Sequence, residues 1–338
     1  MKIMDFSEQS TFGNPVTIST LALSTDQPRS ISMIGGLNGE FAYKSLLGDN
    51  DALNSREPSS GHITTATSGC INHIDIDYFS NRQSHHAIIS CNDFKLRTLD
   101  LTTGLFLHNP SKPSSKDGTL TGHPFPFAIN SSATCPDGRL RVLVGDSSSS
   151  LIVNAQTGKI ETKLTGHTDY IFACAWSPDA RHVVTAGQDR VVKIYDARTW
   201  RVVRTFSSHV SCHRSVRFSP VGGGPRCLLL AEEADRVTVV DARTFAEGQT
   251  HEFYGGVVGC DFEGDGNAFW VANGDGTFGG FMRFERTGKG QRRGLGFTER
   301  RRAGEEEGPD EWIAEEEREG DPRCVNPRRH SDIGGWMT

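Results

Sequence analysis

Residues 166–206 read GHTDYIFACAWSPDARHVVTAGQDRVVKIYDARTWRVVRTF, and this stretch decides the fold. Its apolar residues gather in short bursts, which turn-forming groups such as Ser-Pro-Asp and Gln-Asp separate. The bursts predict four antiparallel strands, at Ile171–Trp176, His182–Ala186, Val191–Tyr195 and Arg201–Phe206. One such sheet cannot bury both of its faces, so we expect further sheets to pack against it.

The stretch is one period of a repeat. Three histidines, His123, His167 and His209, are spaced 44 and 42 residues apart, and three prolines are spaced 42 and 42 apart. A short phrase also recurs, as Asp100-Leu-Thr-Thr-Gly, Asn154-Ala-Gln-Thr-Gly, Asp196-Ala-Arg-Thr-Trp and Asp241-Ala-Arg-Thr-Phe. Four strands in a period of about 42 residues are typical of one blade of a β-propeller.

The pattern predicts an all-β chain with about six recognisable blades, which can also be part of a seven-bladed ring. The strands expected in the other blades are Val16–Leu23, Ser30–Ile34 and Glu40–Lys44; Ile71–Phe79, Ala87–Cys91, Lys95–Leu99 and Leu105–His108; Ala128–Ala133, Leu140–Val144, Leu151–Asn154 and Lys159–Leu164; Ser215–Phe218, Cys227–Ala231, Val237–Val240 and Gln249–Phe253; and Val257–Phe262, Ala268–Ala272 and Phe278–Phe284. A polar loop, Gly48–Gly61, follows the first blade.

The sixth blade lacks a fourth strand in this pattern. We predict that Lys2–Phe6 pairs with Phe278–Phe284 and closes the ring, because an open blade would leave an edge of unpaired backbone groups. The alternatives are that Gly294–Phe297 fills the place or that the ring stays open.

Composition and charge exclude several classes of protein. The chain has 338 residues and a net charge of −6, and no apolar run approaches the roughly 18 residues of a membrane helix. Met1–Ser10 lacks the apolar core of a signal peptide, so we expect a cytoplasmic or nuclear protein without a membrane partner. The eight cysteines contain no Cys-x-x-Cys pair, which argues against a zinc site.

The density of charged residues rises sharply near residue 283. From Arg283 to Thr338 there are 12 basic and 13 acidic residues, a far higher density than before. We therefore predict a propeller over residues 1–286 and a charged, largely disordered tail over 287–338. The basic cluster Arg292–Arg302 is the one candidate contact for nucleic acid, and Trp312 and Ile313 could dock a short helix.

The repeat resembles the WD repeat. Gly166-His167, Ser177-Pro178-Asp179, Asp189 and Tyr195-Asp196 carry the resemblance, although Tyr195 stands where the repeat usually has Trp. The chain from about Asn14 to Arg286 also resembles fungal WD-repeat proteins of uncharacterised function. The segments that carry this likeness are Asn14–Ile18, Pro136–Leu140, Gly166–Tyr170 and Thr277–Gly280. That family is usually longer at the N-terminus, which implies a shortened member.

Four residues of this blade could be mistaken for a catalytic site. His167, Thr185 and Asp189, with Tyr195 beside them, have the residue types of a Ser-His-Asp arrangement. The resemblance implies instead that they form a buried hydrogen-bond network that clamps the strands. We therefore expect a structural role and no catalytic residue.

Two other motifs resemble ligand sites, and we expect neither to bind a cofactor or a metal. Gly274–Gly279 matches G-x-G-x-x-G, but a strand rather than a helix is expected after it, so hairpin chemistry is the better interpretation. His85-His86 lacks a third ligand at metal spacing, and we expect it in a loop entering a strand.

We predict a non-catalytic scaffold that binds other proteins through loops at one end of the propeller. These loops should include Asp169, Tyr170, Arg190, His213, Arg214 and Arg236. Aromatic and arginine side chains are the usual interface anchors, so Tyr170, Arg190, Arg214 and Arg236 are the candidate partner-binding residues. The alternatives are a nucleic-acid adaptor that uses the basic tail, or an enzyme acting in the central channel.

Overall fold

The computed structural model describes residues 16–24, 30–46, 59–63, 69–79, 84–109, 112–113, 122–222, 226–246, 248–277, 279–287 and 311–316. Every regular element in these residues is a β-strand, and they contain no helix long and apolar enough to cross a membrane. The chain divides into two compact units, residues 1–218 and 219–338, which are described one at a time.

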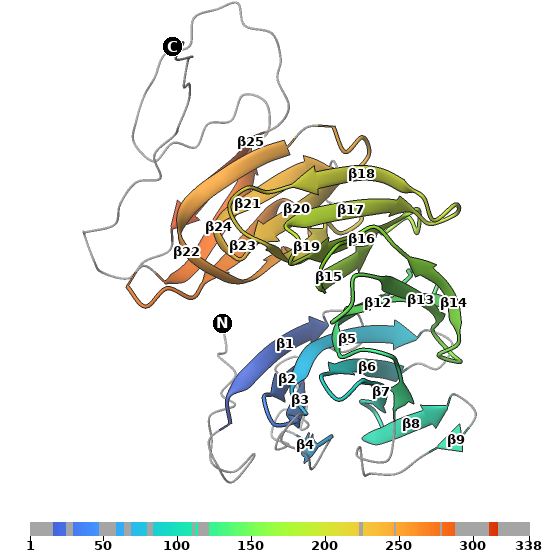
Figure 1. Cartoon of the computed structure of the whole chain (residues 1–338). Coiled ribbons are helices and arrows are strands. Elements are labelled where there is room, and N and C mark those ends of the chain that lie inside the picture. The colour runs from blue at the N-terminus through green and yellow to red at the C-terminus, as the bar shows by residue number, and fades with distance from the viewer. Residues whose placement is uncertain are drawn as a thin grey trace, which may run out of the picture. The chain divides into compact units, whose positions relative to one another are not determined.

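Unit 1 contains four antiparallel sheets, and the main strands of each follow one another in chain order (Figure 1). The sheets are β1 (Ile18–Ser24), β2 (Ser30–Gly36), β3 (Glu40–Leu46) and β4 (Ser59–His62); β5 (Ile71–Phe79), β6 (Ser84–Cys91), β7 (Lys95–Asp100) and β8 (Leu105–Asn109), with β9 (Lys112–Pro113) beside β8 and β10 (His123–Pro124) beside β7; β11 (Ile129–Thr134), β12 (Leu140–Gly145), β13 (Ser150–Asn154) and β14 (Ile160–Leu164); and β15 (Ile171–Trp176), β16 (His182–Gly187), β17 (Val191–Asp196) and β18 (Val202–Ser207). Strand β19 (His213–Phe218) ends the unit.

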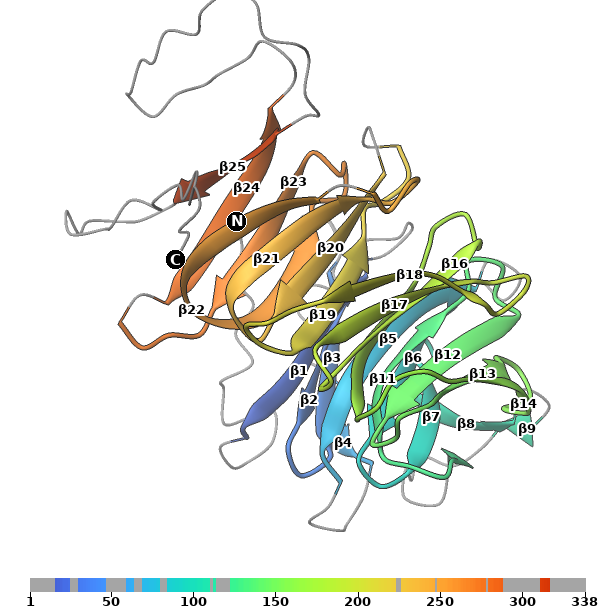
Figure 2. The same cartoon turned by 45° about the horizontal axis from the view of Figure 1, so that its top comes forward.

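The first strands of successive blades lie side by side in unit 1. β1 contacts β5, β5 contacts β11, β11 contacts β15, and β15 contacts β19 (Figure 2). A β-bulge lies near the start of β1, β5, β11 and β15, where it increases the local twist. This succession of inner strands is the arrangement of a propeller, and the predicted all-β propeller fold is confirmed.

Apolar side chains between neighbouring sheets hold the blades together. Trp176, Val183 and Tyr195 of the β15–β18 sheet share one buried cluster with Val142 and Ile152 of the β11–β14 sheet. Burial of each large apolar side chain contributes roughly 1.5–3 kcal/mol. The blades therefore stabilise one another, as the repeat predicts.

Unit 2 is a single antiparallel sheet in chain order. Its strands are β20 (Cys227–Glu232), β21 (Ala234–Asp241), β22 (Gly248–Phe262), β23 (Ala268–Asn273), β24 (Gly280–Thr287) and β25 (Glu311–Glu316). The core on one face includes Leu229, Val239, Phe269 and Phe284.

The six expected blades form five sheets, because β22 joins the last two. Its first part pairs with β21 as far as Gly256, and its second part pairs with β23 from Val257 onward. Gly255 has a φ of 122°, and a Cβ there would lie 2.3 Å from Asn273 Oδ1. Glycine adopts this backbone conformation without a steric clash, so the chain can bend here and continue as a strand. β22 therefore runs through both of the predicted strands, Gln249–Phe253 and Val257–Phe262.

The predicted closing strand is wrong. One edge of β24 pairs with β23, and the other pairs with β25 in a register from Met282↔Glu316 to Thr287↔Glu311. No edge of β24 is left for Lys2–Phe6 or Gly294–Phe297, both of which lie outside the described residues.

Two further expectations about polar segments need correction. The loop predicted at Gly48–Gly61 contains most of β4, because backbone pairing with β3 does not require apolar side chains. Trp312 and Ile313 lie in strand β25 rather than in a helix. The boundary at residue 286 and the disorder of 287–338 stay predictions, since only Thr287 and Glu311–Glu316 of that range are described.

Candidate functional site

The structure brings His167, Thr185, Asp189 and Tyr195 together inside the β15–β18 sheet. His167 Nδ1 lies 2.9 Å from Asp189 Oδ2, and His167 Nε2 lies 2.8 Å from Thr185 Oγ1. The Tyr195 hydroxyl donates to the Thr165 carbonyl at 3.3 Å and also reaches Thr185. All four side chains come from the turn and strand positions that the repeat predicts.

Burial shields these four side chains from solvent. Burial is the main cause of the lowered pKa of His167, so the ring is neutral at pH 7. Burial also raises the pKa of Tyr195 to about 12. Thr185 is fully buried in β16, where no substrate can reach its hydroxyl. The arrangement therefore has the residue types of a hydrolase and not the access that a nucleophile requires.

Asp189 links this network to the loops at one end of the blade. Its carboxylate accepts hydrogen bonds from the backbone N–H groups of Thr168 and Val191, at 3.0 and 3.2 Å. The Gln188 N–H donates to the Tyr170 carbonyl at 2.8 Å, and the Ser208 N–H donates to the Arg190 carbonyl at 2.9 Å. These bonds tie three loops together, at residues 165–170, 188–190 and 208–212. We call these loops, with Arg214 near the start of β19, the blade-four loop surface.

Three of the four predicted partner-binding residues lie on the blade-four loop surface. Tyr170 is 47% exposed, and Arg190 and Arg214 are exposed as well. The Arg214 guanidinium carbon lies 3.9 Å from the centre of the Phe172 ring. Arg190 has a left-handed backbone with a φ of 60°, and no described residue forms a hydrogen bond or ion pair with its side chain.

Two expected loop residues lie elsewhere. His213 is buried, because it is the first residue of strand β19 and not part of the loop before it. Arg236 belongs to unit 2 and lies within β21, where its guanidinium forms ion pairs with Glu252 and, at 3.9 Å, with Glu232. Pairing inside the sheet leaves less of the Arg236 charge for a partner.

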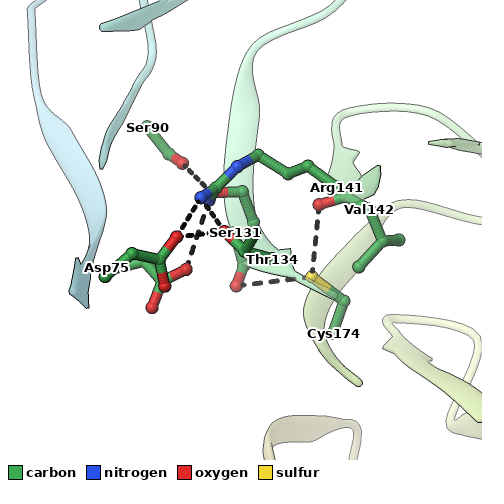
Figure 3. A network of polar contacts seen from close by, with 9 residues as sticks. Asp75, Ser90, Ser131, Thr134, Arg141, Val142 and Cys174 are labelled. Atoms are coloured by element: carbon green, nitrogen blue, oxygen red, sulfur yellow. Dashed lines mark hydrogen bonds and ion pairs between the residues drawn. The ribbon is translucent and has the colours of Figure 1, made fainter. Parts of the chain in front are cut away.

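A second buried network joins the β5–β8 and β11–β14 sheets (Figure 3). Arg141 on β12 is only 3% exposed, and its Nη1 and Nη2 atoms lie 3.2 Å from Asp75 Oδ2 and 2.8 Å from Asp77 Oδ2. Arg141 also donates to Ser132 Oγ at 3.0 Å and to Thr134. One guanidinium thus bridges two carboxylates of the neighbouring blade.

Further buried polar groups lie beside the second network, toward the next blade. The Cys174 thiol lies 3.8 Å from Ser131 Oγ, and burial raises its pKa to about 12, so it stays protonated. Burial first, and then Arg217 and Arg141, lower the pKa of His73 to about 3. These groups supply neither a thiolate nor an imidazolium at neutral pH.

The sequence did not lead us to predict this network, although it contains a signal for it. Asp75 and Asp77 are two residues apart in an apolar strand, so they share one face of β5. Two carboxylates on a buried face require a cation, and Arg141 is the basic residue in the apolar run of β12. The partner could not be chosen without knowing that the two strands face each other.

The remaining motifs lie in a hairpin and in a strand. Gly274–Gly279 connects β23 to β24 in an antiparallel hairpin, and no helix follows it. His85 and His86 lie buried within β6 rather than in a loop, because that strand begins at Ser84. In the described part of the chain, no group of three or more His, Cys, Asp or Glu side chains is placed to hold a metal ion.

Comparison with known proteins agrees with the repeat. Residues 158–196 match the WD40 family, described as WD domain, G-beta repeat. The chain is 32% identical over 95 residues to Histone acetyltransferase type B subunit 2 of Aspergillus oryzae, which covers 26% of this chain and 21% of that protein. It is 31% identical over 88 residues to human THO complex subunit 6, covering 25% of this chain and 26% of the relative.

A third relative matches over a shorter stretch. Mouse Coronin-7 is 44% identical over 48 residues, which cover 14% of this chain and 5% of the relative. The chain therefore spans about a quarter or less of the length of these relatives. The matched repeat and the order of the strands show a β-propeller fold of the WD-repeat type.

Proposed function

We propose that the chain is a non-catalytic scaffold that binds other proteins through the blade-four loop surface, in the cytoplasm or the nucleus. The observation that carries the proposal is the exposure of Tyr170 and Arg190 on loops that backbone hydrogen bonds tie together, with Arg214 exposed near the start of β19. Loops on a rigid frame make effective recognition surfaces, because little conformational entropy is lost on binding.

The names of the relatives support protein partners. Two of them are named as subunits, one of a histone acetyltransferase and one of the THO complex. A subunit contacts other chains by definition, and a propeller blade offers exposed loops for such contacts. We infer the same general role for this chain.

The chemistry of the buried networks argues against an enzyme. Thr185 is inaccessible, and Cys174 stays protonated. The carboxylates of Asp75 and Asp77 already pair with Arg141. The alternative of a nucleic-acid adaptor depends on Arg292–Arg302, which lie outside the described residues, so it stays a prediction.

The test is affinity capture of the tagged full chain from cells, with quantitative mass spectrometry. A photo-cross-linking residue at position 170 would show which captured proteins touch the loop surface. The double variant Tyr170→Ala/Arg214→Ala should lose those proteins. The matched control is Arg181→Ala/Arg198→Ala, because these two arginines are exposed on loops at the other end of the same blade. Recovery of an unchanged set of proteins with the Tyr170/Arg214 variant would overturn the proposal.

A further inference from the structure

The last strand of the β15–β18 sheet has a free edge. β18 pairs with β17 on one side, and none of the described residues pairs with it on the other side. The Ser208 N–H donates to the Arg190 carbonyl, so the backbone groups of Ser208 point toward β17. Because backbone groups alternate in direction along a strand, the N–H and C=O groups of Ser207 and Thr205 point away from β17. These groups are placed to pair with another strand.

Other outer strands of unit 1 are better protected than β18. β4 has four residues and no large apolar side chain, and β9 pairs along the edge of β8. β14 has five residues, and among them Glu161 and Lys163 carry charges of both signs. Short length, covering strands and charged side chains protect an edge from association. β18 has six residues, two adjacent valines and neither an acidic residue nor a proline.

Both faces of β18 expose apolar side chains. Val202 is 44% exposed and Val203 is 54% exposed. Adjacent residues of a strand point to opposite faces of the sheet, so the two valines lie on different faces. The side chains of an added strand can therefore pack on β18 from both sides.

The edge also has an excess of positive charge. Residues 191–207, which form β17, β18 and the turn between them, contain four basic residues and one acidic residue, namely Lys193, Arg198, Arg201, Arg204 and Asp196. Over the whole blade, residues 166–207, the count is six basic and four acidic, so the sign of the excess is the same. Arg201 and Arg204 are exposed, and no described residue forms an ion pair with either one. The Arg204 guanidinium lies 5.6 Å from the centre of the Phe206 ring, a contact that leaves its charge uncompensated.

We infer that β18 binds an extended, acidic peptide segment as an added antiparallel strand. Backbone hydrogen bonds along the free edge supply the affinity, and β-branched side chains pack on Val202 and Val203. Carboxylates that lie opposite Arg201 and Arg204 select the partner, because opposite charges across two strands are stabilising. This site lies along an outer strand and goes beyond the proposed function, which concerns the loops.

A second copy of the chain fits this edge less well than an acidic segment. Two β18 strands in one pair would bring the cations of both copies, Arg201 and Arg204, to the same edge. Like charges on neighbouring strands are destabilising. A strand with carboxylates at these positions makes the same backbone bonds without the repulsion.

A reversal of charge separates specificity from folding. Arg201→Glu/Arg204→Glu keeps both residues exposed and polar but changes the sign of the edge. The matched control is Arg139→Glu/Arg181→Glu, which makes the same change in charge at two exposed residues in turns of unit 1. An unfolded variant would bind no peptide, whereas a folded one should prefer a peptide of the opposite charge.

The experiment measures binding of labelled peptides with blocked ends to the full chain by fluorescence anisotropy. The first probe is TVTEVVE, which places glutamates opposite Arg201 and Arg204 in an antiparallel pair. The others are TVTKVVK and a form of TVTEVVE that is N-methylated at alternate residues and cannot donate backbone hydrogen bonds. We expect TVTEVVE to bind roughly tenfold more tightly than TVTKVVK, and the N-methylated form to lose binding. Bound TVTEVVE should slow the amide exchange of Thr205 and Ser207.

The variants complete the test. Arg201→Glu/Arg204→Glu should prefer TVTKVVK, while the control Arg139→Glu/Arg181→Glu should keep the preference for TVTEVVE. Equal binding of the N-methylated form, or no binding of TVTEVVE, would overturn strand addition. An unchanged preference in the Arg201→Glu/Arg204→Glu variant would place the site elsewhere. Dimers in sedimentation of the chain alone, with slowed exchange of Thr205 and Ser207, would show that a second copy occupies the edge and would overturn the acidic partner.

Discussion

Replacement of Arg141 by methionine tests whether the guanidinium joins two blades. Methionine keeps the length and the apolar stem of the side chain and removes its charge and donors. In the variant, Asp75 and Asp77 lose the cation that lies 3.2 and 2.8 Å away, and Ser132 loses a 3.0 Å bond. Two carboxylates on one face of β5 then repel each other with no compensating charge.

The geometry sets the size of the effect. Removing one partner of a buried ion pair costs about 3–5 kcal/mol, because the other charge stays buried. The side chains of Asp75 and Asp77 are 27% and 23% exposed, so water reaches them in part. We therefore expect a loss of about 2–4 kcal/mol in the free energy of unfolding at pH 7.

The loss should shrink in acid. Burial and the neighbouring Asp75 already raise the pKa of Asp77, while Arg141, Thr134 and His86 act in the opposite direction. Removing Arg141 raises this pKa further. A carboxyl group whose pKa is higher in the folded protein than in the unfolded chain favours the folded state at low pH, and that contribution disappears as the pH rises. The variant should thus approach wild type as the pH falls from 7 toward 5.

The assay is urea denaturation, with hydrogen exchange of β5, β11 and β12 as a local measure. The control is Arg139→Met, because Arg139 is 81% exposed and its pair with Asp137 should contribute below about 1 kcal/mol. Asp75→Asn with Asp77→Asn in the Arg141→Met background should restore part of the stability. If Arg141→Met costs no more than Arg139→Met, or costs more in acid, the bridge does not act as described.

Three further outcomes are expected. Asp189→Ala should cost roughly 1–3 kcal/mol in a melting curve, because it leaves buried donors without an acceptor; an unchanged melt with lost binding would contradict the structural role. Burial lowers the pKa of His251 to about 4, so unit 2 should lose about 3 kcal/mol of stability as the pH falls from 7 to 4, and His251→Phe should remove that slope in pH-dependent denaturation. Removal of residues 303–338 should leave a cooperative melt but raise light scattering, since β24 loses its pairing with β25; loss of the melting transition would show that this segment is needed for folding.

Local sequence patterns predicted most of the strands. The bounds of β15 match the predicted Ile171–Trp176, and those of β17 extend the predicted Val191–Tyr195 by one residue. In both strands, apolar residues recur at regular positions that face a core. The residue types and their spacing therefore predict the same strand. Four strands were missed, namely β4, β9, β10 and β25. β4 and β25 have polar sequences that pair through the backbone, and no apolar periodicity marks such a strand.

The candidate site also has a part that the sequence predicts and a part that it does not. The network of His167, Thr185 and Asp189 lies within one period, so the resemblance to a known repeat was enough to predict it. Arg141 lies 64 and 66 residues from the carboxylates that it bridges, in a different blade. That pairing depends on which faces of two sheets meet, and a single sequence does not contain this information.

The two buried networks show why function is expected at the loops and not in the interior. The central groups of each network pair with one another, since His167 binds both Thr185 and Asp189, and Arg141 binds two aspartates. Such paired groups stiffen the blade that contains them. Asp189 also holds the backbone of Thr168 and Val191, which flank the loops that carry Tyr170 and Arg190. The residues with the appearance of a catalytic site thus position the surface that we propose for binding.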